Sequence, residues 1–163
     1  MILKIKNKDK LVVDDFIFKC SIGKNGVSYN KTEGDGKTPK GEFGFGDVYW
    51  RADRIKKPET KLKCKKILKD AVWCDDPESD FYNKEVKFSK KYRFEKLYRR
   101  DKKYDIFLVI KYNRPNIVKY KGSAIFLHLT KNYKKTAGCI AIKKNDMLIV
   151  LKLLKRNSKI IIS

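Results

Sequence analysis

The apolar residues of this chain occur only in short segments, separated by charged and turn-forming residues. The two longest uninterrupted apolar segments, residues 106–110 and 147–151, have five residues each. Buried strands commonly contain about four to eight residues, whereas a helix that crosses a bilayer needs about 20. The chain is therefore predicted to fold mainly into β-strands and to have no membrane-spanning helix.

Most of these segments have the length or the alternation of strands. Strands are predicted at residues 1–6, 10–20, 42–45, 104–112, 123–129, 139–142 and 159–162. Asn25-Gly26 predicts a type I′ hairpin turn, because both residue types tolerate a positive φ. One helix is predicted, at residues 145–157, with Asn145 as its N-cap and basic Lys155 and Arg156 in its last turn.

The length of 163 residues favours one domain. Residues 56–103 are polar and poorly periodic, with Pro58 and Pro77 as breakers, and predict long loops around short elements. No internal repeat or linker divides the sequence, so residues 1–163 are expected to form a single domain and a monomer. The first six residues alternate like a strand and lack the apolar core and cleavage site of a secretory signal. Either the chain stays inside the cell or a leader has been removed from it.

The net charge of +22 comes from 41 basic and 19 acidic residues. It is unevenly distributed, because residues 1–81 carry a net charge of +4 and residues 82–163 carry +18. A field of this size attracts anionic partners, and nucleic acid, acidic lipid head groups and carboxylate-rich polymers all qualify. Because most of the basic residues are lysine, the charge also reflects a broad compositional bias and is weak evidence for nucleic acid.

Three familiar motifs are incomplete. Gly36-Lys37-Thr38 ends like a phosphate-binding loop, but Lys31 occupies the place of the first glycine and Pro39 follows. The four cysteines show no zinc-ligand spacing and there is one histidine, so no metal site is expected. The adjacent acids at residues 75–76 precede a proline and are expected to cap a turn rather than to form a catalytic carboxylate pair.

The chemically informative segment contains the only histidine, His128, followed after ten residues by Gly138-Cys139. A cysteine nucleophile requires a nearby base that takes its proton, and imidazole is suited to this near neutral pH. A glycine before the cysteine allows close approach of substrate to backbone N–H groups, which can form an oxyanion hole. The alternative is a buried cysteine and a buried histidine with only structural roles.

This segment resembles the signature of the L,D-transpeptidase catalytic domain (YkuD) family, in which a histidine on one strand precedes an [S/T]-x-G-C motif. His128 and T-A-G-C at residues 136–139 match it. Further segments resemble one subgroup of the family, in register along nearly the whole chain: E-G-D-G-x-T-P-x-G at residues 33–41, W-C-D-D-P at 73–77, Y-N at 82–83, E-x-L-x-R-x-D at 95–101, Y-N at 112–113 and G-S-A-I-F-L-H at 122–128.

The resemblance implies a compact β-sandwich or barrel with few helices and a cysteine acyltransferase that acts on peptidoglycan stem peptides. By the same resemblance, Cys139 is the nucleophile, His128 is the base, and backbone amides around Gly138 and Cys139 hold the oxyanion. The carbonyl of Leu129 orients the histidine ring. No cofactor and no metal are implied.

Two positions depart from the commoner family motif, which has a second histidine before Gly-Cys and an arginine or asparagine after it. Here these positions are Ala137 and Ala141. We therefore expect other residues to contact the substrate, with Asn113, Arg114, Lys134 and Thr136 as candidates. A solvated loop without contacts to substrate is the alternative for the lysine-rich residues 131–135.

Two other functions remain open at this point. The same site with water as acceptor would be an L,D-carboxypeptidase, which trims stem peptides without linking them. A non-enzymatic basic module that binds an acidic polymer is an alternative from a different class. The presumed substrate favours the periplasm or cell envelope, although no export signal is visible in the sequence.

Overall fold

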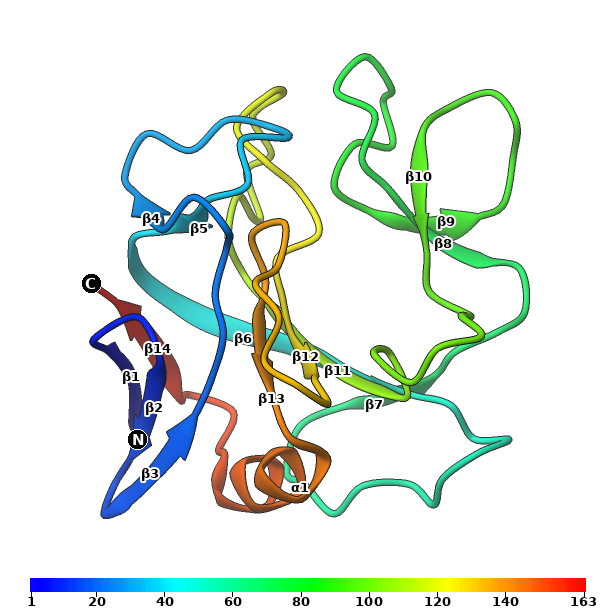
Figure 1. The fold of residues 1–163 in the computed structure, drawn as a ribbon. Helices are drawn as coiled ribbons and strands as arrows, with labels where there is room; N and C mark the ends of the chain where they lie inside the picture. The colour runs from blue at the N-terminus through cyan, green and yellow to red at the C-terminus, as the bar shows by residue number, and fades with distance from the viewer.

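A computed structural model describes residues 1–163 and shows a mainly β protein with one helix (Figure 1). The fold class expected from the sequence is confirmed. The strands, in chain order, are β1 (Ile2–Lys6), β2 (Lys10–Val13), β3 (Phe16–Lys19), β4 (Val27–Ser28), β5 (Thr38–Pro39), β6 (Gly41–Trp50), β7 (Cys64–Lys66), β8 (Ala71–Cys74), β9 (Glu85–Lys87), β10 (Phe94–Lys96), β11 (Ile106–Ile110), β12 (Phe126–Leu129), β13 (Ile140–Ile142) and β14 (Lys159–Ile162). The helix α1 (Lys144–Leu153) lies between β13 and β14.

Nine strands form one sheet in the order β13-β12-β11-β6-β14-β1-β2-β3, with β7 paired to β6. The longest strand, β6, crosses the middle of the molecule and pairs with β11 and β14 as well as β7 (Figure 1). The N-terminal β1 pairs in parallel with the C-terminal β14, so the two ends of the chain lie side by side in the sheet. A separate sheet, β10-β8-β9, comes from the polar middle of the sequence.

The strand interiors explain why these segments fold as strands. All five side chains of β11 and all four of β12 are buried, as expected for apolar runs in the centre of a sheet covered on both faces. Strand β1, which lies between β14 and β2, instead alternates between exposed and buried residues. A main core of 25 buried hydrophobic residues packs against the large sheet. A second core of 11 residues, rich in aromatic rings, lies between the large sheet and the β10-β8-β9 sheet.

The helix is shorter than predicted. It begins at Lys144, after the N-cap Lys143, rather than at an Asn145 cap, and it ends at Leu153. Leu154 has an extended backbone (ψ 140°) and is completely buried, because its side chain joins the main core where the chain turns toward β14. Lys155 and Arg156 therefore lie beyond the last helical turn. The ten-residue α1 is too short to cross a membrane, and no other helix is present.

The predicted type I′ hairpin at Asn25-Gly26 is also wrong. The Gly26 N–H donates to the Gly23 carbonyl, so the central residues of this turn are Lys24 and Asn25, and neither has a positive φ. Gly26 alone has φ 79°. The strand that follows, β4, pairs in parallel with β5 and does not return as a hairpin.

Candidate active site

Cys139 lies directly before β13, with its side chain 9% exposed. Its thiol is held by the main chain on both sides: Sγ donates to the Ala124 carbonyl (3.1 Å) and accepts from the Phe126 N–H (3.3 Å). Both contacts come from the segment that leads into β12, which runs parallel to β13. The parallel pairing of these two strands therefore fixes the position of the sulfur.

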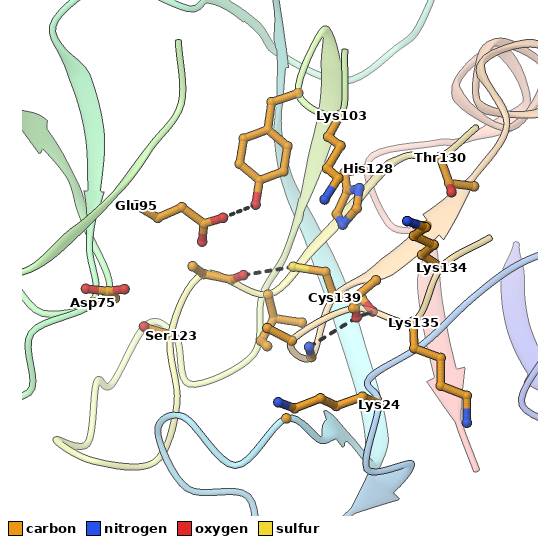
Figure 2. A pocket seen from close by; sticks show the side chains of 18 of the residues that line it. Lys24, Asp75, Glu95, Lys103, Ser123, His128, Thr130, Lys134, Lys135 and Cys139 are labelled. Carbon is orange, nitrogen blue, oxygen red and sulfur yellow. Dashed lines mark hydrogen bonds between the residues drawn. The ribbon is translucent and has the colours of Figure 1, made fainter. Parts of the chain in front are cut away.

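His128 is brought to the same place by β12, where it lies opposite Ala141 of β13. Its Nδ1 is 2.9 Å from the Leu129 carbonyl oxygen. A carbonyl only accepts hydrogen bonds, so Nδ1 carries the proton and Nε2 is the free, basic nitrogen. The edge of the ring packs against Tyr104, with centroids 5.4 Å apart. Figure 2 shows the imidazole and the Cys139 sulfur facing the same cavity.

Burial controls the protonation of both groups. Removal from water raises the pKa of the Cys139 thiol to about 12, and the negative charge of Glu95 acts in the same direction. Burial lowers the pKa of His128 to about 4, although the hydrogen bond to Leu129 partly opposes this. At neutral pH the free protein therefore contains a neutral thiol beside a neutral imidazole.

The loop before Cys139 is braced by Thr136. Its hydroxyl donates to the Cys139 carbonyl (2.6 Å) and accepts from the Gly138 N–H (3.1 Å). Gly138 has φ 149°, and a Cβ at this position would lie 2.8 Å from the Lys37 carbonyl oxygen, so only glycine fits. Because the Gly138 N–H is already engaged, the Cys139 N–H, which donates to no group of the protein, is the better oxyanion donor.

A cleft of about 1050 Å³ opens over these residues. Ten basic and four acidic side chains line it, so it has a strong excess of positive charge. The basic residues are Lys24, Lys31, Arg93, Arg99, Lys102, Lys103, Lys131, Lys134, Lys135 and Lys144, and the acidic ones are Glu33, Asp75, Glu95 and Asp101. The volume is at the upper end of the range for small-ligand pockets, about 300–1,000 Å³, and accommodates a peptide.

The structure brings some of the expected substrate-binding residues to this cleft and not others. Lys134 and Thr136 line it, together with the alanines at 137 and 141. Asn113 does not line the cleft, because its side chain bonds to Val118 and Gly122 and closes its own loop. Arg114 also lies elsewhere, where it donates to the Asn83 carbonyl.

Two cleft residues to which the sequence analysis assigned no role in the site lie beside the thiol. Tyr104 is buried between His128 and Glu95, and its hydroxyl donates to the Glu95 carboxylate. Glu95 belongs to β10, so its place in the cleft depends on the docking of the separate β10-β8-β9 sheet. Tyr104 is marked in the sequence only as the edge of a predicted strand, and Glu95 only as the first residue of the E-x-L-x-R-x-D segment, so no local pattern gives either side chain a role in the site.

Lys31 is a third such residue, and it is 3% exposed. Its Nζ lies 2.7 Å from Asp35 Oδ1, and its side chain fills the space beside Gly122 and Gly138. A lysine this deeply buried needs an ionic partner, which the neighbouring aspartate supplies. In the sequence Lys31 was notable only as the residue that interrupts a phosphate-loop pattern.

The acids at residues 75–76 stabilise a turn, as expected. Asp76 accepts from the Glu78 and Arg93 N–H groups, and Asp75 pairs with the Arg93 guanidinium. All four cysteines are free thiols. No three or more histidine, cysteine, aspartate or glutamate side chains are grouped as metal ligands.

Comparison with known proteins identifies the family. The sequence profile of YkuD, the L,D-transpeptidase catalytic domain, matches residues 2–162. No curated protein sequence matches the chain. Among solved structures it is similar to one described as the structure of Bdellovibrio bacteriovorus Bd1075, with 14% identity and a TM-score of 0.48 over 99% of this chain and 47% of that one. The chain thus spans less than half the length of that protein. Because the profile covers almost every residue, the chain belongs to the YkuD family of L,D-transpeptidase catalytic domains.

Proposed function

We propose that this protein is a cysteine L,D-transpeptidase that joins peptidoglycan stem peptides through a thioester intermediate. The observation that carries the proposal is the geometry at His128. Its Nδ1–H is bound to the Leu129 carbonyl, which leaves a basic Nε2 in the cleft that also holds the Cys139 thiol. This geometry supports the roles of nucleophile for Cys139, base for His128 and orienting group for the Leu129 carbonyl.

In the first step the Cys139 sulfur attacks the carbonyl of the diamino acid in a tetrapeptide stem. The thiol proton passes to His128 Nε2, and the Cys139 N–H stabilises the negative charge that develops on the carbonyl oxygen. The carbon–nitrogen bond then breaks, His128 returns the proton to the leaving amine, and D-alanine departs. The product is a thioester between Cys139 and the shortened stem.

In the second step an amine of another stem attacks the thioester. His128 takes the proton of this amine and returns it to the sulfur, which regenerates the neutral pair and yields a 3→3 cross-link. Because both groups start neutral, the proton moves during the attack, and the site does not depend on a thiolate formed beforehand. A neutral sulfur that is held among main-chain groups also resists unwanted reactions in the absence of substrate.

The basic cleft supports an anionic substrate, since stem peptides carry free carboxylates. Peptidoglycan as substrate places the site of action in the cell envelope. Membership in an enzyme family, together with a thiol and an imidazole that face one cleft, favours catalysis over the alternative of a basic polymer-binding module.

The test is to incubate purified protein with tetrapeptide muropeptides and to follow the products by mass spectrometry. We expect release of D-alanine, a mass increase on Cys139 and dimeric product, all lost in Cys139→Ala. Tripeptide without dimers would show that water is the acceptor and that the protein is an L,D-carboxypeptidase. No D-alanine release by the intact protein, or equal release by Cys139→Ala, would refute the proposal.

A further inference from the structure

Glu95 is a carboxylate of the cleft that also contains the Cys139 thiol. One of its oxygens accepts from the Tyr104 hydroxyl, and the other accepts no hydrogen bond from the protein. It lines the same cleft as Cys139, and its charge raises the pKa of that thiol. Figure 2 shows Glu95 on one side of Cys139 and the lysines Lys134 and Lys135 on the other.

The other acidic side chains of the cleft are already engaged. Asp75 pairs with Arg93 at 3.1 Å and Asp101 pairs with Arg99 at 2.6 Å. Glu33 has no cation partner, but one of its oxygens accepts from two hydroxyls, those of Tyr82 and Ser123. Glu95 has a single neutral donor and no cation at ion-pair distance.

Burial of Glu95 without a cation is unfavourable, and it raises the pKa of this carboxyl group. A positively charged group that entered the cleft beside it would restore the charged carboxylate and form a charge-assisted hydrogen bond with the free oxygen. Elsewhere the cleft repels cations, because ten basic side chains line it. Of the two cleft carboxylates without a cation, only Glu95 acts on the pKa of the Cys139 thiol, so a substrate ammonium group beside the thiol is most favourably placed at Glu95.

We propose that Glu95 binds the free side-chain ammonium group of the diamino acid whose carbonyl Cys139 attacks, an inference that rests on the proposed acyl transfer. The ammonium group is held at the Glu95 carboxylate on one side of the thiol, while the stem carboxylates lie toward the lysines on the other. Tyr104 holds the carboxylate in place and also contacts the imidazole, so recognition of the amine and orientation of the base share one residue. Glu95 is thus a specificity-determining residue for the acyl donor.

The experiment compares two tetrapeptide donors that differ only at the third residue. One carries a diamino acid, and the other carries an isosteric residue in which a methyl group replaces the side-chain amine. D-alanine release is measured for the intact protein, for Glu95→Gln and for Asp75→Asn as the matched control. Gln keeps an oxygen for the Tyr104 hydroxyl and removes only the charge, whereas Asp75 is a cleft carboxylate already paired with arginine.

We expect the intact protein and Asp75→Asn to prefer the diamino donor by roughly 10- to 100-fold in kcat/KM, as for a hydrogen bond between charged groups. In Glu95→Gln this preference should fall to within about threefold, because loss of the charge alters the reactivity of the thiol toward both donors alike but removes a contact of the diamino donor alone. The preference of the intact protein is informative even if the variant is unstable, which its thermal unfolding temperature would reveal.

Equal turnover of both donors by the intact protein would overturn the assignment. So would an equal loss for both donors in Glu95→Gln, or a defect confined to transfer onto the acceptor amine. If neither donor releases D-alanine with the intact protein, the acyl-transfer function itself is refuted and this inference falls with it.

Discussion

At the scale of single residues, burial sets the chemistry of this site. Cys139 and His128 both lie in the interior, and the same desolvation that raises the thiol pKa lowers the imidazole pKa. A preformed thiolate–imidazolium pair would require the opposite shifts. In the proposed mechanism the free protein is therefore a resting state, and the Cys139 thiol becomes reactive only as its proton moves to Nε2.

The first prediction concerns the reactivity of the Cys139 thiol toward iodoacetamide. Because its pKa is about 12, the thiolate fraction should rise about tenfold for each pH unit between pH 6 and 10, without a plateau. The rate is measured by peptide mass spectrometry at Cys139, with Cys139→Ser as a control for the other cysteines. A fast rate at pH 7 that levels off above an inflection near pH 5 would indicate an ion pair instead.

The second prediction concerns stability in acid. The pKa of His128 is about 4 in the folded protein and 6.5 when exposed, so the unfolded chain binds more protons between these values. The contribution of the neutral imidazole is fully present above pH 6.5 and is lost as the pH falls toward 4. Between pH 7 and pH 5 the free energy of unfolding should decrease by about 2 kcal/mol from this group.

Urea unfolding of the intact protein and of His128→Gln at both pH values measures this contribution. The variant should lose about 2 kcal/mol less than the intact protein over the same interval. Identical losses would show that the imidazole is accessible to protons in the folded state.

At the scale of elements, local patterns predicted the strands better than the ends of the helix. Residues 106–110 form β11 as predicted, because a run of five apolar residues fits a strand that is covered on both faces. The helical spacing of apolar residues continues to Leu154, but the chain leaves the helix there because the extended backbone lets Leu154 reach the core. The hairpin prediction at Asn25-Gly26 was wrong for a related reason. The strand after this turn, β4, pairs with the later strand β5 and not with the segment before the turn.

The third prediction tests how α1 is anchored. Met147 is fully buried against the main core, whereas the adjacent Leu148 is 39% exposed. Met147→Ala should lower the free energy of unfolding by about 2–5 kcal/mol, because it removes packed atoms and leaves a cavity. Leu148→Ala, the matched control, should change it by less than about 1 kcal/mol. Similar losses in denaturant unfolding for the two variants would show that α1 packs through a different face.

At the scale of the whole molecule, charge and fold act together. The second half of the sequence carries a net charge of +18, and the fold gathers part of it around the cleft, where ten basic side chains face four acidic ones. The positive charge therefore lines the cleft that contains the Cys139 thiol. Under the proposed function, this charge raises the local concentration of carboxylate-bearing stem peptides.

The fourth prediction follows from this field. Turnover of a muropeptide with free carboxylates should decrease several-fold in kcat/KM as ionic strength rises from about 0.05 to 0.3 M, because screening shortens the range of the attraction. The same peptide with its carboxylates amidated should show little dependence on salt. D-alanine release measures both, and equal salt dependence would rule out electrostatic attraction to the cleft.

The sequence by itself determined the mainly β fold class and the long apolar strands, but not the short strands β4, β5 and β7–β10, and it singled out Cys139 and His128 as the candidate site. Apolar runs and alternation are local properties, and a histidine followed by T-A-G-C indicates thiol chemistry through its resemblance to the family signature. Only the tertiary structure decided what surrounds Cys139. Parallel pairing of β12 and β13 brings His128 to the cleft, docking of β10 adds Glu95, and a closed loop keeps Asn113 away. These outcomes depend on contacts between residues far apart in the chain, such as Ser123 with Glu33, 90 positions away, and no local pattern encodes such contacts.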